Sequence, residues 1–204
     1  MMTSLRFLGA GVLGLGLSGC ISLLPEPAPA PSIYRLSTAE VASAAEPNAE
    51  IIRVDRPASS TYFESKDIVV SPDGSRLATA SGAEWAEVTP IMVQDALISA
   101  MSASPKLIGV LPSSGARTQT RVHLTIKNFE AQFDQGEERA PLAIVRYDVT
   151  FSNASDRTLL GTFSTRQTQR ADAVRVSAIV EAIEGANKAA MSDIIAWLEG
   201  EVAS

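Results

Sequence analysis

The sequence of 204 residues has one cysteine, one histidine and fewer basic than acidic residues. A single cysteine excludes an intramolecular disulfide, a Cys-x-x-Cys redox pair and a zinc site built from cysteines. The single histidine, His123, excludes a site with several histidine ligands and leaves little for acid–base catalysis at neutral pH. The sequence also lacks a Gly-x-Ser-x-Gly elbow, a His-Glu-x-x-His pair and a phosphate-cradling Gly-rich loop. We therefore expect no enzyme, no cofactor and no metal.

The shortage of basic residues also limits the kinds of partner that the protein can bind. The chain has 17 Lys and Arg against 23 Asp and Glu, a formal net charge of −6. General nucleic-acid binding needs clustered Lys and Arg that neutralise phosphates, so we expect no nucleic-acid partner. The length fits one domain with a short extension, and the hydrophobic content of 46% allows a core of ordinary size.

The one long apolar run, Phe7–Leu17, has about eleven residues and is too short for a spanning helix, which needs about twenty. It follows a short segment containing Arg6, the layout of a secretory signal. The next residues complete Leu17-Ser18-Gly19-Cys20, which looks like a bacterial lipobox. The alternatives are a plain signal peptide with an unrelated cysteine, or a buried free cysteine. We predict a lipoprotein signal peptide over residues 1–19 and acyl chains, including palmitate, on Cys20.

Alternate prolines follow this cysteine at positions 25, 27, 29 and 31. Such a segment favours extended polyproline II, so residues 20–32 form a lipidated tether that reaches on the order of 35–40 Å. Cys20 is followed by Ile21 and not by the aspartate that retains lipoproteins in the inner membrane of enteric bacteria. We therefore expect a periplasm-facing protein of the outer membrane of a Gram-negative cell. Residues 33–204 form the folded domain.

Short strands come first in that domain. Alternating or apolar runs predict strands at 33–36, 50–54, 67–70 and 76–79, the last two joined by the turn Pro72-Asp73-Gly74. Thr89 and Pro90 predict the start of a helix, with Thr89 as its cap. An apolar stripe at helical spacing continues it until Pro105. A short strand follows at 106–111.

Three long alternating segments then predict an antiparallel meander, at 121–133, 143–151 and 159–168. The first of them changes phase after Lys127, which predicts a bulge near Asn128. A last apolar stripe from Val176 to Leu198 predicts a long helix, with Asn187 inside the stripe and Trp197 beside it. The predicted fold is α+β, a mostly antiparallel sheet with two helices on one face.

Four residues are candidates for contact with a partner. Trp85 precedes the first helix, where it either plugs the core or contacts a partner directly. Arg121, Lys127 and Arg146, with Arg166, either form a basic strip that meets acidic groups or belong to a solvated face with ion pairs to Asp148. His123 shares that polar phase. The stripe of the last helix is a core face or, alternatively, lines a lipid-binding groove.

An ordered set of motifs carries a family resemblance. It comprises the lipobox and Pro-rich tail leading to Tyr34-Arg35-Leu36, then Val54-Asp55-Arg56-Pro57, Ile68-Val69-Val70, Ala83-Glu84-Trp85-Ala86-Glu87, Met92-Val93-Gln94-Asp95-Ala96-Leu97, and the late meander and helix. Together they resemble the ABC-type transport auxiliary lipoprotein family, the paraquat-inducible protein C-like proteins. The resemblance spans nearly the whole mature chain.

The resemblance implies a non-catalytic, lipid-anchored auxiliary component of an ABC transport system. The substrate-binding subunit of that system carries mammalian-cell-entry domains, and the system moves lipids or other hydrophobic solutes between two membranes. The expected partners are this mammalian-cell-entry-domain protein, the membrane that receives the acyl chains of Cys20 and, as a further option, phospholipid. The alternatives are a tethered lipid-binding carrier and an envelope-assembly scaffold.

Replacing the anchoring thiol tests this prediction. Cys20→Ser cannot form a thioether, so the protein should no longer incorporate labelled palmitate and should leave the membrane fraction, since two or three acyl chains are needed for stable anchoring. Fractionation of host cells after labelling measures both. Equal membrane attachment of Cys20→Ser would rule out the lipoprotein interpretation.

Overall fold

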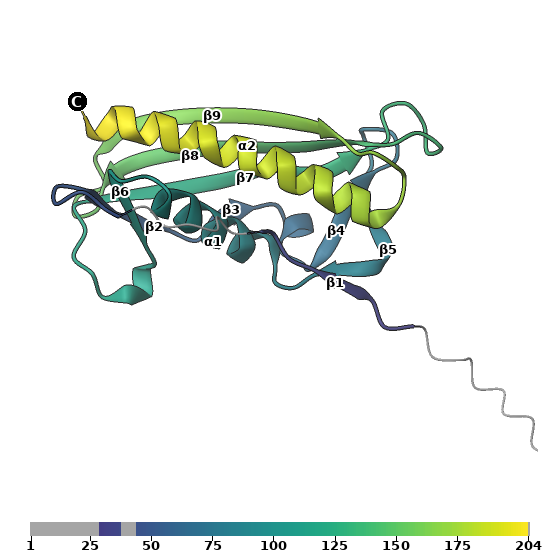
Figure 1. The fold of residues 1–204 in the computed structure, drawn as a ribbon, viewed down its shortest axis with the longest axis horizontal. Helices are drawn as coiled ribbons and strands as arrows, with labels where there is room; N and C mark the ends of the chain where they lie inside the picture. The colour runs from purple at the N-terminus through teal and green to yellow at the C-terminus, as the bar shows by residue number, and fades with distance from the viewer. Residues whose placement is uncertain (1–28, 38–43, 204) are drawn as a thin grey trace, which may run out of the picture.

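The computed structural model describes residues 29–37 and 44–203, so the predicted signal peptide and Cys20 lie outside the described residues. Figure 1 shows the elements, which are β1 (Ser32–Tyr34), β2 (Glu50–Val54), β3 (Ala58–Ser59), β4 (Asp67–Ser71), β5 (Ala78–Trp85), α1 (Thr89–Ser102), β6 (Leu107–Val110), β7 (Thr120–Gln132), β8 (Leu142–Asn153), β9 (Leu159–Arg170) and α2 (Val176–Val202). Two short 3-10 turns, Thr61–Phe63 and Pro112–Ser114, complete the order.

β7 is the central strand of the nine-stranded sheet. On one edge it pairs in parallel with β2, β3 and β4, one after another along its length. On its other edge it pairs with β8 in antiparallel fashion, and β8 pairs with β9 in the same way. β5 adds to β4, β1 adds to β5, and β6 adds to β2. All the other strands are therefore connected to β7, either directly or through the strands that pair with it.

A bulge divides β7, as the change of phase in the sequence predicted. The register with β8 shifts between Ile126 and Asn128, which leaves Lys127 without a partner residue. Before the bulge Val122, Leu124 and Ile126 are buried, and after it Phe129 and Ala131 are buried. Side chains alternate along a strand with a period of two. One extra residue therefore keeps both halves of β7 turned toward the core.

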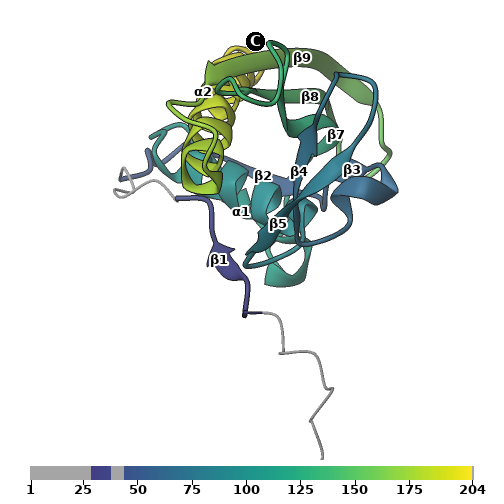
Figure 2. The same ribbon diagram turned by 90° about the vertical axis from the view of Figure 1, so that its right-hand side faces the viewer.

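Both helices lie inside the curve of the sheet (Figure 2). α2 packs on β7, β8 and β9, whereas α1 packs on β2 and β6 and touches α2. The predicted α+β fold with two helices on one face is thus confirmed, and so are the meander and the hairpin of β4 and β5. The parallel pairings and the two-residue β3 were not predicted, because they join segments far apart in the sequence.

The helices differ from the sequence prediction at their ends and flanks. Val88 and not Thr89 precedes the first turn of α1, and the buried hydroxyl of Thr89 has no hydrogen-bond partner, so the predicted cap was wrong. Trp197 of α2 stacks on Phe163 of β9 with ring centroids 5.3 Å apart, which extends the helix–sheet contact beyond the apolar stripe. No helix among the described residues is long and apolar enough to cross a membrane.

Among the described residues, a buried hydrogen bond between two side chains connects α2 to the middle of the sheet. The hydroxyl of Tyr147 in β8 donates to Oδ1 of Asn187 in α2 at 2.6 Å, and both residues are buried. Burial raises the pKa of the Tyr147 hydroxyl well above its ordinary value, so it remains a donor across the physiological range. Asn187 thus has a hydrogen-bond partner in the sheet. Its position inside an apolar stripe does not indicate which residue that partner is.

A double-mutant cycle tests this contact. Tyr147→Phe and Asn187→Leu should each lower the free energy of unfolding by about 1–3 kcal/mol, because each leaves one buried polar group without a partner. The double variant should lose less than the sum of the two, because it removes both groups together. Denaturant unfolding measures all three, and additive losses would show that the two side chains do not interact.

Candidate functional site

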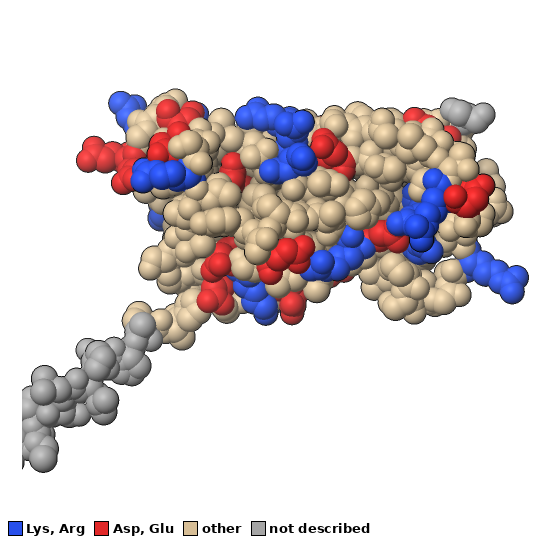
Figure 3. All heavy atoms as spheres, turned by 180° about the vertical axis from the view of Figure 1, so that it is seen from behind, with Lys and Arg blue, Asp and Glu red and all other residues tan. Residues whose placement is uncertain are grey.

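The two faces of β8 and β9 have different neighbours. Tyr147 of β8 bonds to α2, and Thr165 and Gln167 of β9 both donate to Asp193 of α2 at 2.6 Å. Because alternate residues of a strand point to opposite faces, Arg146 and Arg166 point away from the helix. They lie on the outer face of the sheet, the side shown in Figure 3.

Three basic residues cross this outer face side by side. In the sheet register Asn128 of β7 lies opposite Arg146 of β8, and Arg146 lies opposite Arg166 of β9. Lys127 is exposed at the bulge beside Asn128. Figure 3 shows basic side chains gathered near the middle of this face. We call Lys127, Arg146 and Arg166 the cationic row.

The cationic row is poorly neutralised. Within the described part of the chain, Lys127 and Arg166 form no ion pair, and Arg146 has only Asp148, whose Oδ1 lies 4.0 Å from its Nη2. That carboxylate oxygen also accepts a hydrogen bond of 2.8 Å from Ser164. Like charges directly opposite one another destabilise a sheet by about 0.2–1 kcal/mol per pair. The described part of the chain therefore contains a row of cations that lowers the stability of the folded domain. This row is present although the whole protein has a negative net charge.

Arg121 belongs to a different cluster. Its guanidinium pairs with Asp55, which also accepts a hydrogen bond of 3.1 Å from Nε of Arg53 in β2. Arg121 lies opposite Ser152, near the other end of β7 and β8. Of the predicted basic strip, the structure therefore brings Lys127, Arg146 and Arg166 together, whereas Arg121 shares the carboxylate of Asp55 with Arg53.

A buried carboxyl lies beside the cationic row. Glu130, two residues beyond Asn128 in β7, is only 7% exposed, and its Oε1 accepts a hydrogen bond of 3.0 Å from Nδ2 of Asn128. Burial raises the pKa of Glu130 above its ordinary value, and the bond from Asn128 offsets part of that effect. Glu130 cannot be singled out from the sequence, because its position continues the polar alternation of the strand.

The remaining candidates have structural surroundings. Trp85 is 1% exposed and packs on Phe129 with ring centroids 5.9 Å apart, so direct contact with a partner would require its ring to leave the core. His123 lies opposite Thr150, and its side chain forms no hydrogen bond or ion pair with another described residue. No group of three or more His, Cys, Asp or Glu among residues 29–37 and 44–203 is arranged to hold a metal ion.

Solved structures share this fold. The protein XCC0632 from Xanthomonas campestris superposes with a TM-score of 0.74 at 18% identity, covering 84% of this chain and 97% of that one. An uncharacterised protein has a TM-score of 0.65 at 12% identity, covering 83% and 99% of the two chains. The hypothetical protein CT253 from Chlamydia trachomatis has a TM-score of 0.51 at 9% identity, covering 76% and 98%. At these identities the likeness shows the fold alone.

Comparison of sequences is more specific. A family model described as the ABC-type transport auxiliary lipoprotein component matches residues 34–195. No protein of curated function matches the chain in sequence. The matched range includes α1, the meander and most of α2.

The buried Glu130 carboxyl predicts a pH dependence of stability. A carboxyl whose pKa is raised by folding costs no stability below the pKa of the unfolded chain, and the cost develops as the pH rises above that value through the folded pKa. Glu130→Gln, which keeps the acceptor for Asn128, should therefore raise the free energy of unfolding on the order of 1 kcal/mol at pH 7. At pH 4 the two proteins should be nearly equal. A difference that is the same at both pH values in denaturant unfolding would contradict this assignment.

Proposed function

The chain belongs to the ABC-type transport auxiliary lipoprotein family, and we propose that it docks on a transport system whose substrate-binding subunit has mammalian-cell-entry domains. In this proposal the system carries lipids or other hydrophobic solutes between two membranes. The chain contributes binding and not catalysis. The family description supports an auxiliary role in transport.

The cationic row supports docking as the task of the folded domain. Lys127, Arg146 and Arg166 form a basic surface on strands whose opposite face packs on α2. Arg146 and Arg166 lie opposite each other, and among the described residues their one ion pair is the long contact of Arg146 with Asp148. This opposition is a cost to the isolated domain, and an acidic surface of a partner would reduce that cost. The single observation that carries the proposal is the direct opposition of Arg146 and Arg166. The proposed partner surface is therefore acidic.

The proposed anchor is the acylated Cys20 in the outer membrane, with the domain facing the periplasm. The tether of residues 20–32 gives the domain a reach on the order of 35–40 Å. The chain enters the sheet at β1, which pairs only with β5 among the described strands (Figure 1). A partner on the cationic row and a membrane on the tether would thus engage separate parts of the protein.

The direct test is a binding measurement. The full lipoprotein, purified from native membranes, should bind the periplasmic part of the mammalian-cell-entry-domain protein, and its affinity should fall with rising salt, because salt screens exposed charges. The variant Arg146→Ser with Arg166→Ser should bind roughly fivefold to thirtyfold more weakly, from about 0.5–1 kcal/mol per exposed charge. It should unfold at the same or a slightly higher denaturant concentration, because the two like charges no longer face each other.

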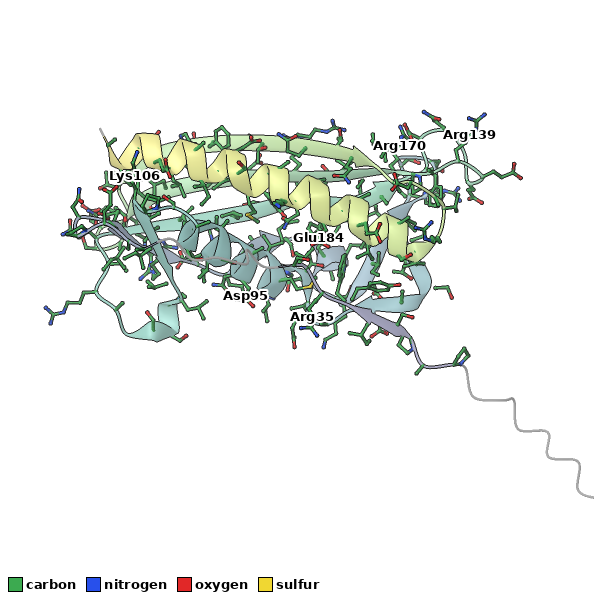
Figure 4. The ribbon with its side chains drawn as sticks, viewed as in Figure 1. Arg35, Asp95, Lys106, Arg139, Arg170 and Glu184 are labelled. Atoms are coloured by element: carbon green, nitrogen blue, oxygen red, sulfur yellow. The ribbon has the colours of Figure 1, made fainter. Side chains whose placement is uncertain are left out.

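Arg139→Ser is the matched control. Arg139 is an exposed residue of the loop between β7 and β8, and Figure 4 shows it at the far end of the sheet. Arg139→Ser removes one positive charge, as each substitution in the row variant does. It should leave the affinity for the partner unchanged. If the wild-type protein fails to bind the partner, the proposed function is wrong. If it binds and the row variant binds equally well, the function stands and another surface makes the contact.

A further inference from the structure

β9 forms one margin of the sheet, and no strand lies beyond it (Figure 1). It has 12 residues and pairs with β8 alone among the described strands. The strands at the two ends of the remaining sheet are short, since β1 has 3 residues and β6 has 4. Natural sheets keep exposed margins short or block them, because free backbone groups there pair with other strands. β9 is therefore the one long open margin within residues 29–37 and 44–203.

The hydrogen-bond pattern shows which backbone groups of β9 face away from β8. In an antiparallel pair every second residue bonds to the neighbouring strand, and the residues between them direct their N–H and C=O groups away from it. At the end of the ladder the N–H of Ala171 donates to the carbonyl of Pro141 at 2.9 Å. The register continues from there to Thr162 without a shift. Odd-numbered residues therefore bond to β8, and the outward backbone groups belong to Thr162, Ser164, Arg166 and Thr168.

These outward groups are accessible, and we call residues 162–168 the open edge. Within the described part of the chain, no hydrogen bond joins their backbone to a group outside β8. The side chains of the four outward residues are exposed and lie on the same face as Arg146. Arg170, beyond the open edge, is held by Asp134 and by the carbonyl of Ala140. At about 3.3 Å per residue, the open edge is roughly 20 Å long.

The sequence of the open edge favours pairing with a strand of opposite charge. Thr and Phe are strand formers, and residues 162–168 contain neither proline nor glycine. Their one charged residue is Arg166. A charge on a margin strand opposes pairing with a strand of like charge, whereas a carboxylate directly opposite stabilises the pair. The open edge is therefore selective for an acidic strand.

A second copy of the chain is a poor occupant for the same reason. Two copies of β9 joined across a two-fold axis would bring their cationic rows together on one face, and like charges that face each other destabilise a sheet. The docking partner does not meet this obstacle, because the surface proposed for it is acidic. Arg166 is also a member of the cationic row, so a partner on the row reaches the open edge.

We propose that an extended acidic segment of the docking partner adds to the open edge as a further strand. Its backbone bonds to the outward N–H and C=O groups of β9, and one of its carboxylates lies opposite Arg166. In such an addition the main-chain hydrogen bonds give affinity and alternate side chains give selectivity. The inference rests on the docking proposed above and states how the partner is held.

Hydrogen–deuterium exchange, read residue by residue on the full lipoprotein, tests the added strand. The probe is the periplasmic part of the mammalian-cell-entry-domain protein. In the free protein the amides of Ser164 and Arg166 should exchange faster than those of Phe163 and Thr165, which bond to β8. With the probe, exchange at Ser164 and Arg166 should slow by roughly tenfold or more, because a new hydrogen bond must open first. The amides of β6 are the control and should not change.

The other outcomes separate this inference from the proposed function. If the probe does not bind, both are wrong. If it binds and leaves exchange at Ser164 and Arg166 unchanged, the docking function stands and the added strand is wrong. If exchange at these two amides slows without the probe as the protein concentration rises, a second copy occupies the open edge, which would also overturn the proposal.

Substitutions at Thr162 separate the backbone from the side chain. Thr162→Pro removes an outward N–H, a position at which a margin strand tolerates proline. It should bind the probe roughly twofold to tenfold more weakly, the effect of one lost hydrogen bond. Thr162→Ala keeps the N–H and should bind as the wild type does. Equal binding by the two variants, both folded in denaturant unfolding, would contradict the added strand. If Thr162→Pro does not fold, the exchange measurement on the wild-type protein decides.

Discussion

The extra residue in β7 is the constraint on which the other features depend. β7 pairs with four strands, so its orientation fixes that of the whole sheet. Without the bulge, a strand of 13 residues with this sequence would turn half of its apolar residues to the solvent. With it, Ile126 and Phe129 both face the core, and Lys127 is left exposed on the outer face. The same insertion therefore completes the core and adds a cation beside Arg146.

The sheet separates two kinds of surface. Its inner face is occupied by α2, which is held by the bond between Tyr147 and Asn187 and by Asp193. In the part of the chain that the structure describes, both α-helices pack on the inner side, and the outer face carries the cationic row. α2 thus packs on β8 and β9 behind the strands that carry Arg146 and Arg166.

Periodic patterns within single segments of the sequence predicted several strands and helices correctly. The alternation in β8 and β9, the stripe of α2 and the phase change at Lys127 each follow from periodicity within one segment. Pairings between distant segments had no such pattern, which is why the parallel contacts of β2, β3 and β4 were missed. The Thr89 cap was wrong because burial of that side chain outweighed the local preference. Arg121 was grouped with Lys127 because both lie on the polar side of the alternating pattern in one strand. Its ion pair with Asp55 depends on the position of β2, which that pattern does not reveal.

The central claim is that the folded domain acts through the outer face of β7, β8 and β9. An electron cryo-microscopy structure of the full lipoprotein bound to its transport partner tests this most directly. The account predicts carboxylates of the partner within about 4 Å of the guanidinium groups of Arg146 and Arg166, the distance expected of ion pairs. A complex in which this face is exposed to solvent and the partner contacts another surface would contradict it.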